Sequence, residues 1–325
     1  MSFEKYKLIN PTLLPKPTDI PDDHIAYNPS GIWTVKSKSG KCHDIMYVRT
    51  EQNHSCSGSS HIGRTCITPR IVDVNNFNKP LKPYYEADQY RGEDASLTRI
   101  YRRLGNGAIK EVWLLSFVCP KPFSDKPNQV ETLHTEFYVG ERLDDMELIA
   151  KGPEWMKDIR IAQKLGSLAL HIYGRPQPKE YSGNITYTTI DSIEKLNDRV
   201  ISEAPFIRDD LLPIGSGIWG GVNDVINIDA DNNMLLSHRG RINKDGSGRC
   251  YESILYKHNT RDNSIVDLGV LATANLFSDV TIKADESADC SNVVFSGGGY
   301  NGKLDIITCG VGDGSIGISR VQRLN

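Results

Sequence analysis

Two adjacent carboxylates, Glu93 and Asp94, immediately precede residues 95–101, which have the composition of a β-strand. Arg91 lies two residues before Glu93, and Arg99 lies five residues after Asp94. A carboxylate beside arginines is suited to acid/base chemistry on an anionic or sugar substrate. Because successive side chains of a strand point to opposite faces, we expect one carboxylate to face a cleft and the other to anchor the loop. A solvated charged turn is the alternative.

Basic side chains at the ends of later strand-like segments form a second candidate group. Arginine forks match the geometry of phosphate, and histidine adds a donor whose charge can change near neutral pH. We therefore predict a phosphate pocket made by Lys157, Arg160, Arg175, His238 and Arg239. The alternative is that these basic groups are solvated.

Sugar-binding candidates complete the predicted site. Arg49 and Glu51 are two residues apart on a strand and therefore share a face, where they are either sugar ligands or a surface ion pair. Further predicted contacts with hydroxyl groups or sugar faces come from Glu93, Asp158, Asp224, Tyr90 and Trp219. For Asp224, a structural role in accepting backbone N–H groups is the alternative.

Composition excludes several classes of protein. The net charge of −3 provides no overall positive field for nucleic acid. No apolar run approaches the ~20 residues that span a bilayer, and residues 1–7 lack the apolar core of a signal peptide. We therefore expect a cytoplasmic protein without membrane or nucleic-acid partners.

The seven cysteines show no close pair with metal-ligand spacing. Cys56 and Cys66, with His54 and His61 nearby, come nearest to a zinc motif, but free thiols are the expected state. We predict neither a metal nor a cofactor.

The elements that position these residues are predicted to be strands. Short apolar runs, such as 45–48, 112–118, 168–173 and 304–308, are separated by Gly, Asn and Asp. The best helical candidate, residues 193–201, is weak. Four prolines in residues 1–25 indicate an extended N-terminal arm.

A repeat of about 65 residues relates the starts of five strand-like units. Asn28, Asp94, Asp158, Asp224 and Asp289 are spaced 66, 64, 66 and 65 residues apart. Regular β units of this length are typical of propellers. We predict an all-β fold, a five-bladed β-propeller that forms a single domain over residues 1–325, with these polar residues around one mouth of the channel. A β-solenoid and a two-sheet sandwich are the rival architectures.

Several motifs resemble known carbohydrate-active families. Gly92-Glu93-Asp94, Arg49-Thr50-Glu51 and Leu236-Ser237-His238-Arg239-Gly240 resemble signatures of glycoside hydrolase family 130, the β-mannoside phosphorylases. The closer resemblance is to glycosyltransferase family 108. It rests on Tyr27-Asn28-Pro29, Arg49-Thr50-Glu51, 157–162, Gly174-Arg175-Pro176-Gln177, 294–298 and Gly310-Val311-Gly312-Asp313.

The resemblance implies a five-bladed propeller that makes or breaks β-1,2-mannosidic bonds with inversion. It implies GDP-mannose or mannose 1-phosphate as donor, a mannose-containing oligosaccharide as partner, and Asp94 as the catalytic carboxylate. The Pro-Arg that follows Glu-Asp in family 130 is Ala95-Ser96 here, which favours the transferase group.

The expected function is therefore β-1,2-mannosyl transfer with reversible phosphorolysis of mannan oligosaccharides. One alternative is a β-mannoside hydrolase of the family 130 type, in which Asp158 or Asp224 would activate water. The other is a non-catalytic propeller that binds carbohydrate or protein.

Overall fold

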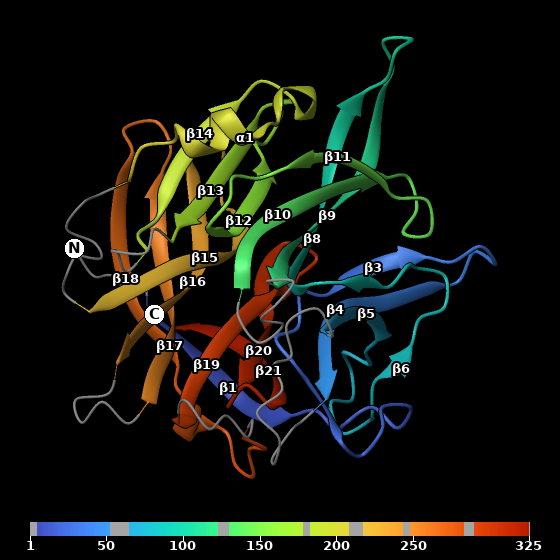
Figure 1. Ribbon diagram of the computed structural model, residues 1–325, viewed down its shortest axis with the longest axis vertical. Coiled ribbons are helices and arrows are strands. Elements are labelled where there is room, and N and C mark those ends of the chain that lie inside the picture. Colours follow the sequence, from blue (N-terminus) through green and yellow to red (C-terminus); the bar gives the residue numbers. More distant parts are fainter. Residues whose placement is uncertain are drawn as a thin grey trace.

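The structure is a computed structural model, and it describes residues 5–52, 65–122, 130–177, 183–207, 217–242, 248–282 and 289–324. His54, Cys56 and His61 lie outside the described residues. The described chain is nearly all β (Figure 1), with one short α-helix, α1 (Asp198–Ser202), and two 3₁₀ turns, η1 (Ile193–Lys195) and η2 (Ala274–Leu276). The predicted all-β class is confirmed, and the helical candidate at 193–201 is limited to η1 and part of α1.

The first sheet follows the order β2-β4-β5-β6, with β3 paired to β4 and β7 paired to β5. Its strands are β2 (His24–Tyr27), β3 (Trp33–Lys36), β4 (Cys42–Gln52), β5 (Cys66–Ile71), β6 (Lys82–Pro83) and β7 (Tyr90–Arg91). β4 carries Arg49 and Glu51 toward the centre of the molecule.

The next two sheets are antiparallel meanders that begin with the candidate carboxylates. One contains β8 (Glu93–Arg103), β9 (Ile109–Pro122), β10 (Val130–Gly140) and β11 (Glu147–Lys151). The other contains β12 (Met156–Gln163), β13 (Leu170–Pro176) and β14 (Thr186–Ile190).

The remaining strands form one eight-stranded sheet that consists of two antiparallel halves. The first half is β15 (Ile218–Asn227), β16 (Asn232–Ile242), β17 (Gly248–Asn259) and β18 (Ser264–Ala272). The second half is β19 (Asp289–Tyr300), β20 (Lys303–Val311), β21 (Ser315–Leu324) and β1 (Lys5–Leu13). A short parallel pairing of β17 with β19 joins the halves. Because β1 pairs with β21, the first part of the predicted N-terminal arm is an extended strand at a sheet edge.

Apolar clusters between successive sheets hold the molecule together. Tyr47 and Leu97 belong to the cluster between the first and second sheets, and Ile100 and Ile159 to the next one. Two further clusters lie between β12–β14 and β15–β18, and between β15–β18 and β19–β21. A last cluster packs β20 and β21 against the first sheet. The sheets therefore follow one another around a common centre, as Figure 1 shows.

A β-bulge recurs in the strands that line this centre, near the start of β8 and β12 and farther along β15 and β19. The pairing register shifts between Glu93 and Ser96, between Lys157 and Arg160, between Val222 and Asp224, and between Ser296 and Gly298. Asp94 and Asp158 lie in the first two bulges with φ of 52° and 50°, and Asn28 has φ of 42°. Asn and Asp adopt this left-handed conformation more readily than most residues. The predicted repeat therefore marks a backbone feature at its first three positions.

The last two repeat positions do not mark the bulge, although Asp289 begins β19 as the repeat predicts. In β15 the bulge residue is Asn223, and Asp224 follows it. In β19 the bulge is at Gly297, eight residues after Asp289, whose side chain lies outside the described residues. In β15 the repeat position and the bulge differ by one residue, because the spacing varies by one or two residues between units.

Candidate active site

Asp94 is held at the centre of the molecule by two residues of the first sheet region. Its Oδ1 accepts a hydrogen bond of 3.0 Å from Nδ2 of Asn28 and lies 3.6 Å from Nη1 of Arg49. The backbone at Gly310 makes room for Asn28, since a Cβ at Gly310 would lie 2.0 Å from Oδ1 of Asn28. The carboxylate is thus oriented by packing between distant segments.

Glu93 and Asp94 face the same side, which contradicts the alternation that we predicted for them. Nη2 of Arg49 lies 3.1 Å from Oε1 of Glu93, while Nη1 of the same guanidinium approaches Asp94. The bulge explains the difference, because two residues of β8 oppose one residue of β9 and the period of two is interrupted.

Arg49 is the centre of an acidic network. Its Nη2 also donates to Oε2 of Glu51 over 3.2 Å, and its guanidinium lies 4.8 Å from the ring centre of Tyr27. Burial lowers the pKa of Arg49. The combined effect of Glu93, Tyr27, Glu51 and Asp94 is opposite and larger, so the pKa is held well above the ordinary value. The predicted shared face of Arg49 and Glu51 is confirmed, and the pair is buried instead of lying on the surface.

Asp158 is fully buried among cationic and polar side chains. Its Oδ2 lies 2.7 Å from Nε of Arg175 as an ion pair that lacks the alignment of a hydrogen bond, and 3.8 Å from Nε2 of His238. Burial raises the pKa of Asp158, but the guanidinium groups of Arg175 and Arg160 lower it below its ordinary value. Asp158 therefore stays charged, and its ion pair helps to hold Arg175 in position.

The guanidinium of Arg160 donates its hydrogen bonds to backbone carbonyl groups. Nε donates to the carbonyl of Asn223 over 2.8 Å, and Nη2 donates to the carbonyl of Asp94 over 3.2 Å. A third hydrogen bond from Nη1 goes to the carbonyl of Ile159. This buried side chain ties β12 to the bulges of β8 and β15.

His238 is a buried and neutral imidazole. Burial lowers its pKa to about 3, although Asp158 acts in the opposite direction. Nδ1 lies 2.8 Å from Oδ1 of Asn223, and because this oxygen can only accept, the proton of the neutral ring resides on Nδ1. Nε2 is then an acceptor.

A cavity of about 150 Å³ brings many of these side chains together. Of the predicted site residues, its wall contains Arg49, Glu93, Asp94, Lys157, Arg175 and His238. Nζ of Lys157 lies 3.5 Å from Oε2 of Glu93. Glu51, Asp158 and Arg160 are not wall residues, and they contact the residues that are.

The other four predicted site residues, Tyr90, Arg239, Trp219 and Asp224, are not wall residues either. Tyr90 packs between Phe117 and Tyr138, with ring centres 5.0 Å away in both cases. Arg239 forms an ion pair of 3.0 Å with Glu252, because it points to the other face of β16 from His238. Trp219 donates from Nε1 to the hydroxyl of Tyr251 over 3.0 Å.

Asp224 accepts hydrogen bonds of 2.8 Å from the backbone N–H groups of Val225 and Gly299. Burial raises its pKa to about 6, although both hydrogen bonds lower it. This arrangement matches the structural alternative that the sequence left open, in which the carboxylate accepts backbone N–H groups, and it joins the two halves of the eight-stranded sheet.

Sequence reasoning missed six residues of the wall: Asn28, Arg249, Tyr251, Val293, Phe295 and Asp313. Asn28 carried a signal, since it belongs to the repeat, and Asp313 belongs to a motif of the family resemblance. Phe295 likewise belongs to the motif at 294–298. Nothing in the local sequence marks Arg249, Tyr251 and Val293, which enter the wall because the parallel pairing of β17 with β19 brings them there.

Larger hollows occur elsewhere on the surface. One of about 740 Å³ is bordered by residues 11–17 and 278–281, and one of about 540 Å³ lies beside Trp33 and Tyr101. Neither combines buried carboxylates with cations as the central cavity does. Size alone therefore does not identify the site. None of the helices in the described chain is long and apolar enough to cross a membrane.

The fold and the charged central cavity define an all-β protein of the propeller type. Residues 118–321 match the family described as "Protein of unknown function (DUF1861)", and the chain belongs to this family. No curated protein matches the sequence significantly.

Solved structures share the fold over almost the whole chain. MPT-1, a GDP-Man-dependent mannosyltransferase from Leishmania mexicana, is 21% identical with a TM-score of 0.75, covering 98% of this chain and 90% of that one. MPT-4, a mannose phosphorylase from Leishmania mexicana in complex with phosphate ion, is 19% identical with a TM-score of 0.74, covering 97% and 88%. The catalytic domain of the Coprinopsis cinerea GH62 alpha-L-arabinofuranosidase is 10% identical, with a TM-score of 0.54 and coverage of 99% and 98%.

Proposed function

We propose that the protein is an inverting mannosyl-transferring enzyme that acts on β-1,2-mannosides and exchanges the mannosyl group with a phosphate-bearing partner. The observation that carries the proposal is the position of Asp94 in a wall that also contains Lys157, Arg175 and Arg249. A proton-transfer group and a site for an anion are the two requirements of a glycoside phosphorylase or a sugar-phosphate-dependent transferase.

In phosphorolysis, Asp94 acts as general acid and protonates the leaving oxygen of the glycosidic bond, directly or through a hydroxyl of the sugar. Phosphate attacks the anomeric carbon from the other face of the ring, which gives mannose 1-phosphate with inversion. In synthesis the same carboxylate acts as general base on the acceptor hydroxyl, as reversibility requires.

The anion is bound by Lys157, Arg175 and Arg249, with His238 as a neutral acceptor for a protonated phosphate oxygen or a sugar hydroxyl. Arg49 and Glu93 bind sugar hydroxyls, and Tyr251 and Phe295 supply apolar contacts. Asp158, Arg160, Glu51, Asp224 and Trp219 position these groups. Tyr90 contributes to packing, and Arg239 forms a surface ion pair.

The size of the cavity limits which part of a donor it can enclose. Its volume of about 150 Å³ is smaller than the roughly 300–1,000 Å³ of sites that enclose drug-sized ligands. One sugar ring is therefore enclosed, and the base of a nucleotide-sugar donor would lie outside. Support for GDP-mannose and mannose 1-phosphate comes from the activities named for the two Leishmania structures.

We count the two halves of the eight-stranded sheet as separate blades, which gives a single five-bladed domain.

The first test is to incubate the protein with β-1,2-mannobiose and longer β-1,2-mannans, with and without inorganic phosphate. The proposal predicts mannose 1-phosphate only when phosphate is present, and the loss of at least 10²-fold in rate for Asp94→Asn, because removal of a positioned acid or base costs about 10²–10⁴-fold. Glu111→Gln, an exposed residue of β9, serves as the matched control.

Three outcomes would redirect the proposal. Mannosyl transfer from GDP-mannose without phosphorolysis would assign the transferase direction alone. Free mannose released without phosphate would assign a hydrolase. If every donor and mannoside is inert while the chain is folded, a binding function would replace the enzymatic one.

A further inference from the structure

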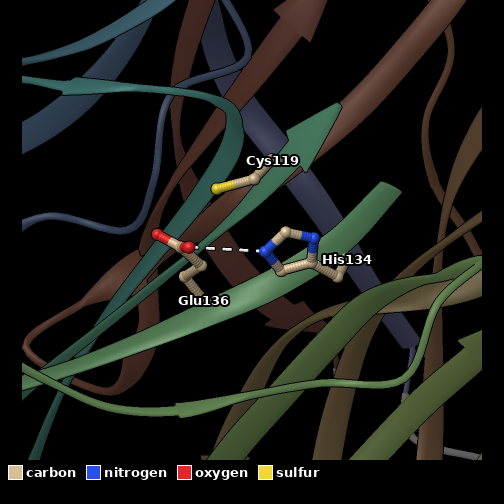
Figure 2. A group of neighbouring side chains, drawn as sticks. All are labelled: Cys119, His134 and Glu136. Atoms are coloured by element: carbon tan, nitrogen blue, oxygen red, sulfur yellow. Dashed lines mark hydrogen bonds and ion pairs between the residues drawn. The ribbon is translucent and has the colours of Figure 1, made fainter. Parts of the chain in front are cut away.

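We propose that Cys119, His134 and Glu136 form a binding site for a zinc ion beside the central cavity. Figure 2 shows the three side chains converging from β9 and β10. Their potential ligand atoms all lie within 4.8 Å of one another. None of the three residues belongs to the cavity wall described above.

The strand pairing explains why these residues meet. Cys119 of β9 and His134 of β10 are directly opposite in the antiparallel register. Glu136 lies two residues after His134 and therefore shares its face of the sheet. All three side chains are partly buried, so an ion could enter from solvent and would then be partly shielded from it.

The donor set matches zinc, which binds thiolate, imidazole and carboxylate groups at about 2.0–2.3 Å in tetrahedral sites. These bond lengths imply separations of about 3.3–3.8 Å between ligand atoms. Nε2 of His134 already lies 3.3 Å from Oε1 of Glu136. Side-chain rotations would bring the three ligand atoms, which lie within 4.8 Å of one another, to these separations. A water molecule would fill the fourth position.

Charge also favours a divalent cation. A thiolate, a carboxylate and a neutral imidazole together balance the charge of Zn²⁺. Zinc would replace the thiol proton, which is released to solvent as the Zn–S bond forms.

Two further residues hold the Glu136 carboxylate. The hydroxyl of Tyr138 donates to Oε2 over 2.8 Å, and Nζ of Lys151 lies 2.9 Å from Oε1. The hydrogen bond from Tyr138 to the second oxygen is the kind of outer contact that orients a metal-binding carboxylate. Lys151 is exposed and can turn toward solvent when zinc takes Oε1.

The site can be tested on the full chain after treatment with a chelator, using Co²⁺ as a spectroscopic probe and Zn²⁺ as the competitor. We expect a thiolate-to-cobalt charge-transfer band that zinc abolishes. Cys119→Ser should remove this band, and His134→Gln should weaken binding at least tenfold. Zinc at a hundred times its Kd should raise the Tm by roughly 5 °C.

Controls separate this site from other thiols. Cys42→Ser changes an exposed free cysteine and should leave the band unchanged. Cys56→Ser tests the other candidate cysteine named from the sequence. A band that survives Cys119→Ser, or disappears in Cys56→Ser, would overturn the proposal, as would the absence of any band. Circular dichroism of each metal-free variant checks folding, and His134→Gln provides a second variant if Cys119→Ser does not fold.

Discussion

Arg160 donates a hydrogen bond of 3.2 Å to the backbone carbonyl of Asp94, from a strand of the following sheet. The same guanidinium reaches the carbonyl of Asn223 in the sheet after that. One buried side chain therefore connects three sheets at the point where the proposed catalytic carboxylate leaves the regular strand.

Replacement of Arg160 should therefore affect both stability and activity. For Arg160→Gln we expect a loss of roughly 3 kcal/mol in the free energy of unfolding, because buried carbonyls lose charged donors and Asp158 loses a cation. Chemical denaturation measures this loss. Arg239→Gln is the matched control, since its partly exposed ion pair should contribute less than about 1 kcal/mol. Equal effects of the two variants would contradict the role of Arg160.

Gly310 should be essential for the orientation of Asp94. In Gly310→Ala the new methyl group would collide with Asn28, whose Nδ2 holds Asp94, and activity should fall at least tenfold. Gly105→Ala places its methyl group in open space and should be neutral. The double variant Gly310→Ala/Asn28→Ala should regain part of the lost stability but not activity, because the new Cβ would still lie 2.9 Å from the backbone nitrogen of residue 28. Recovery of activity would show that Asn28 does not position the carboxylate.

Lys157 offers a test of the anion site with little structural disturbance. Lys157→Gln should raise the KM for phosphate or the donor about tenfold, because a charge-assisted hydrogen bond is worth about 1.5–3 kcal/mol. Its ion pair with Glu93 is long, so the Tm should change little. Initial rates at varied phosphate concentration provide the measurement, with Lys79→Gln on the exposed surface as control. An unchanged KM would remove Lys157 from the anion site.

Buried His238 should make the protein sensitive to acid. Its pKa is about 3 in the folded chain and about 6.5 when unfolded, so the unfolded state binds more protons between these values. Stability is therefore fully present above about pH 6.5 and decreases as the pH falls, by at most about 1.4 kcal/mol per pH unit for one proton.

His238→Gln should reduce this slope between pH 6 and 4, as measured by urea denaturation at each pH. The comparison is made as a difference, because Asp224, with its pKa raised to about 6, acts with the opposite sign in part of this range. If both proteins show the same slope, His238 is not kept neutral by the fold.

The sequence by itself determined the β class, the strand-length runs, and the position of Asp94 at a recurring feature of the chain. It also determined that Arg49 and Glu51 share a face, because local alternation needs no knowledge of tertiary contacts. The repeat identified Asn28, Asp94 and Asp158, since positions with left-handed backbone conformation favour Asn and Asp.

Only the tertiary structure decided which face of each strand looks inward and which basic groups are available. His238 faces the cavity, while Arg239 pairs with Glu252, and the donors of Arg160 are taken by carbonyl groups. Bulges change the phase of alternation, so Glu93 and Asp94 reach the same guanidinium. The pairing of β17 with β19 and the contact between Cys119 and His134 join residues that are distant in sequence, and such contacts depend on the register of whole sheets.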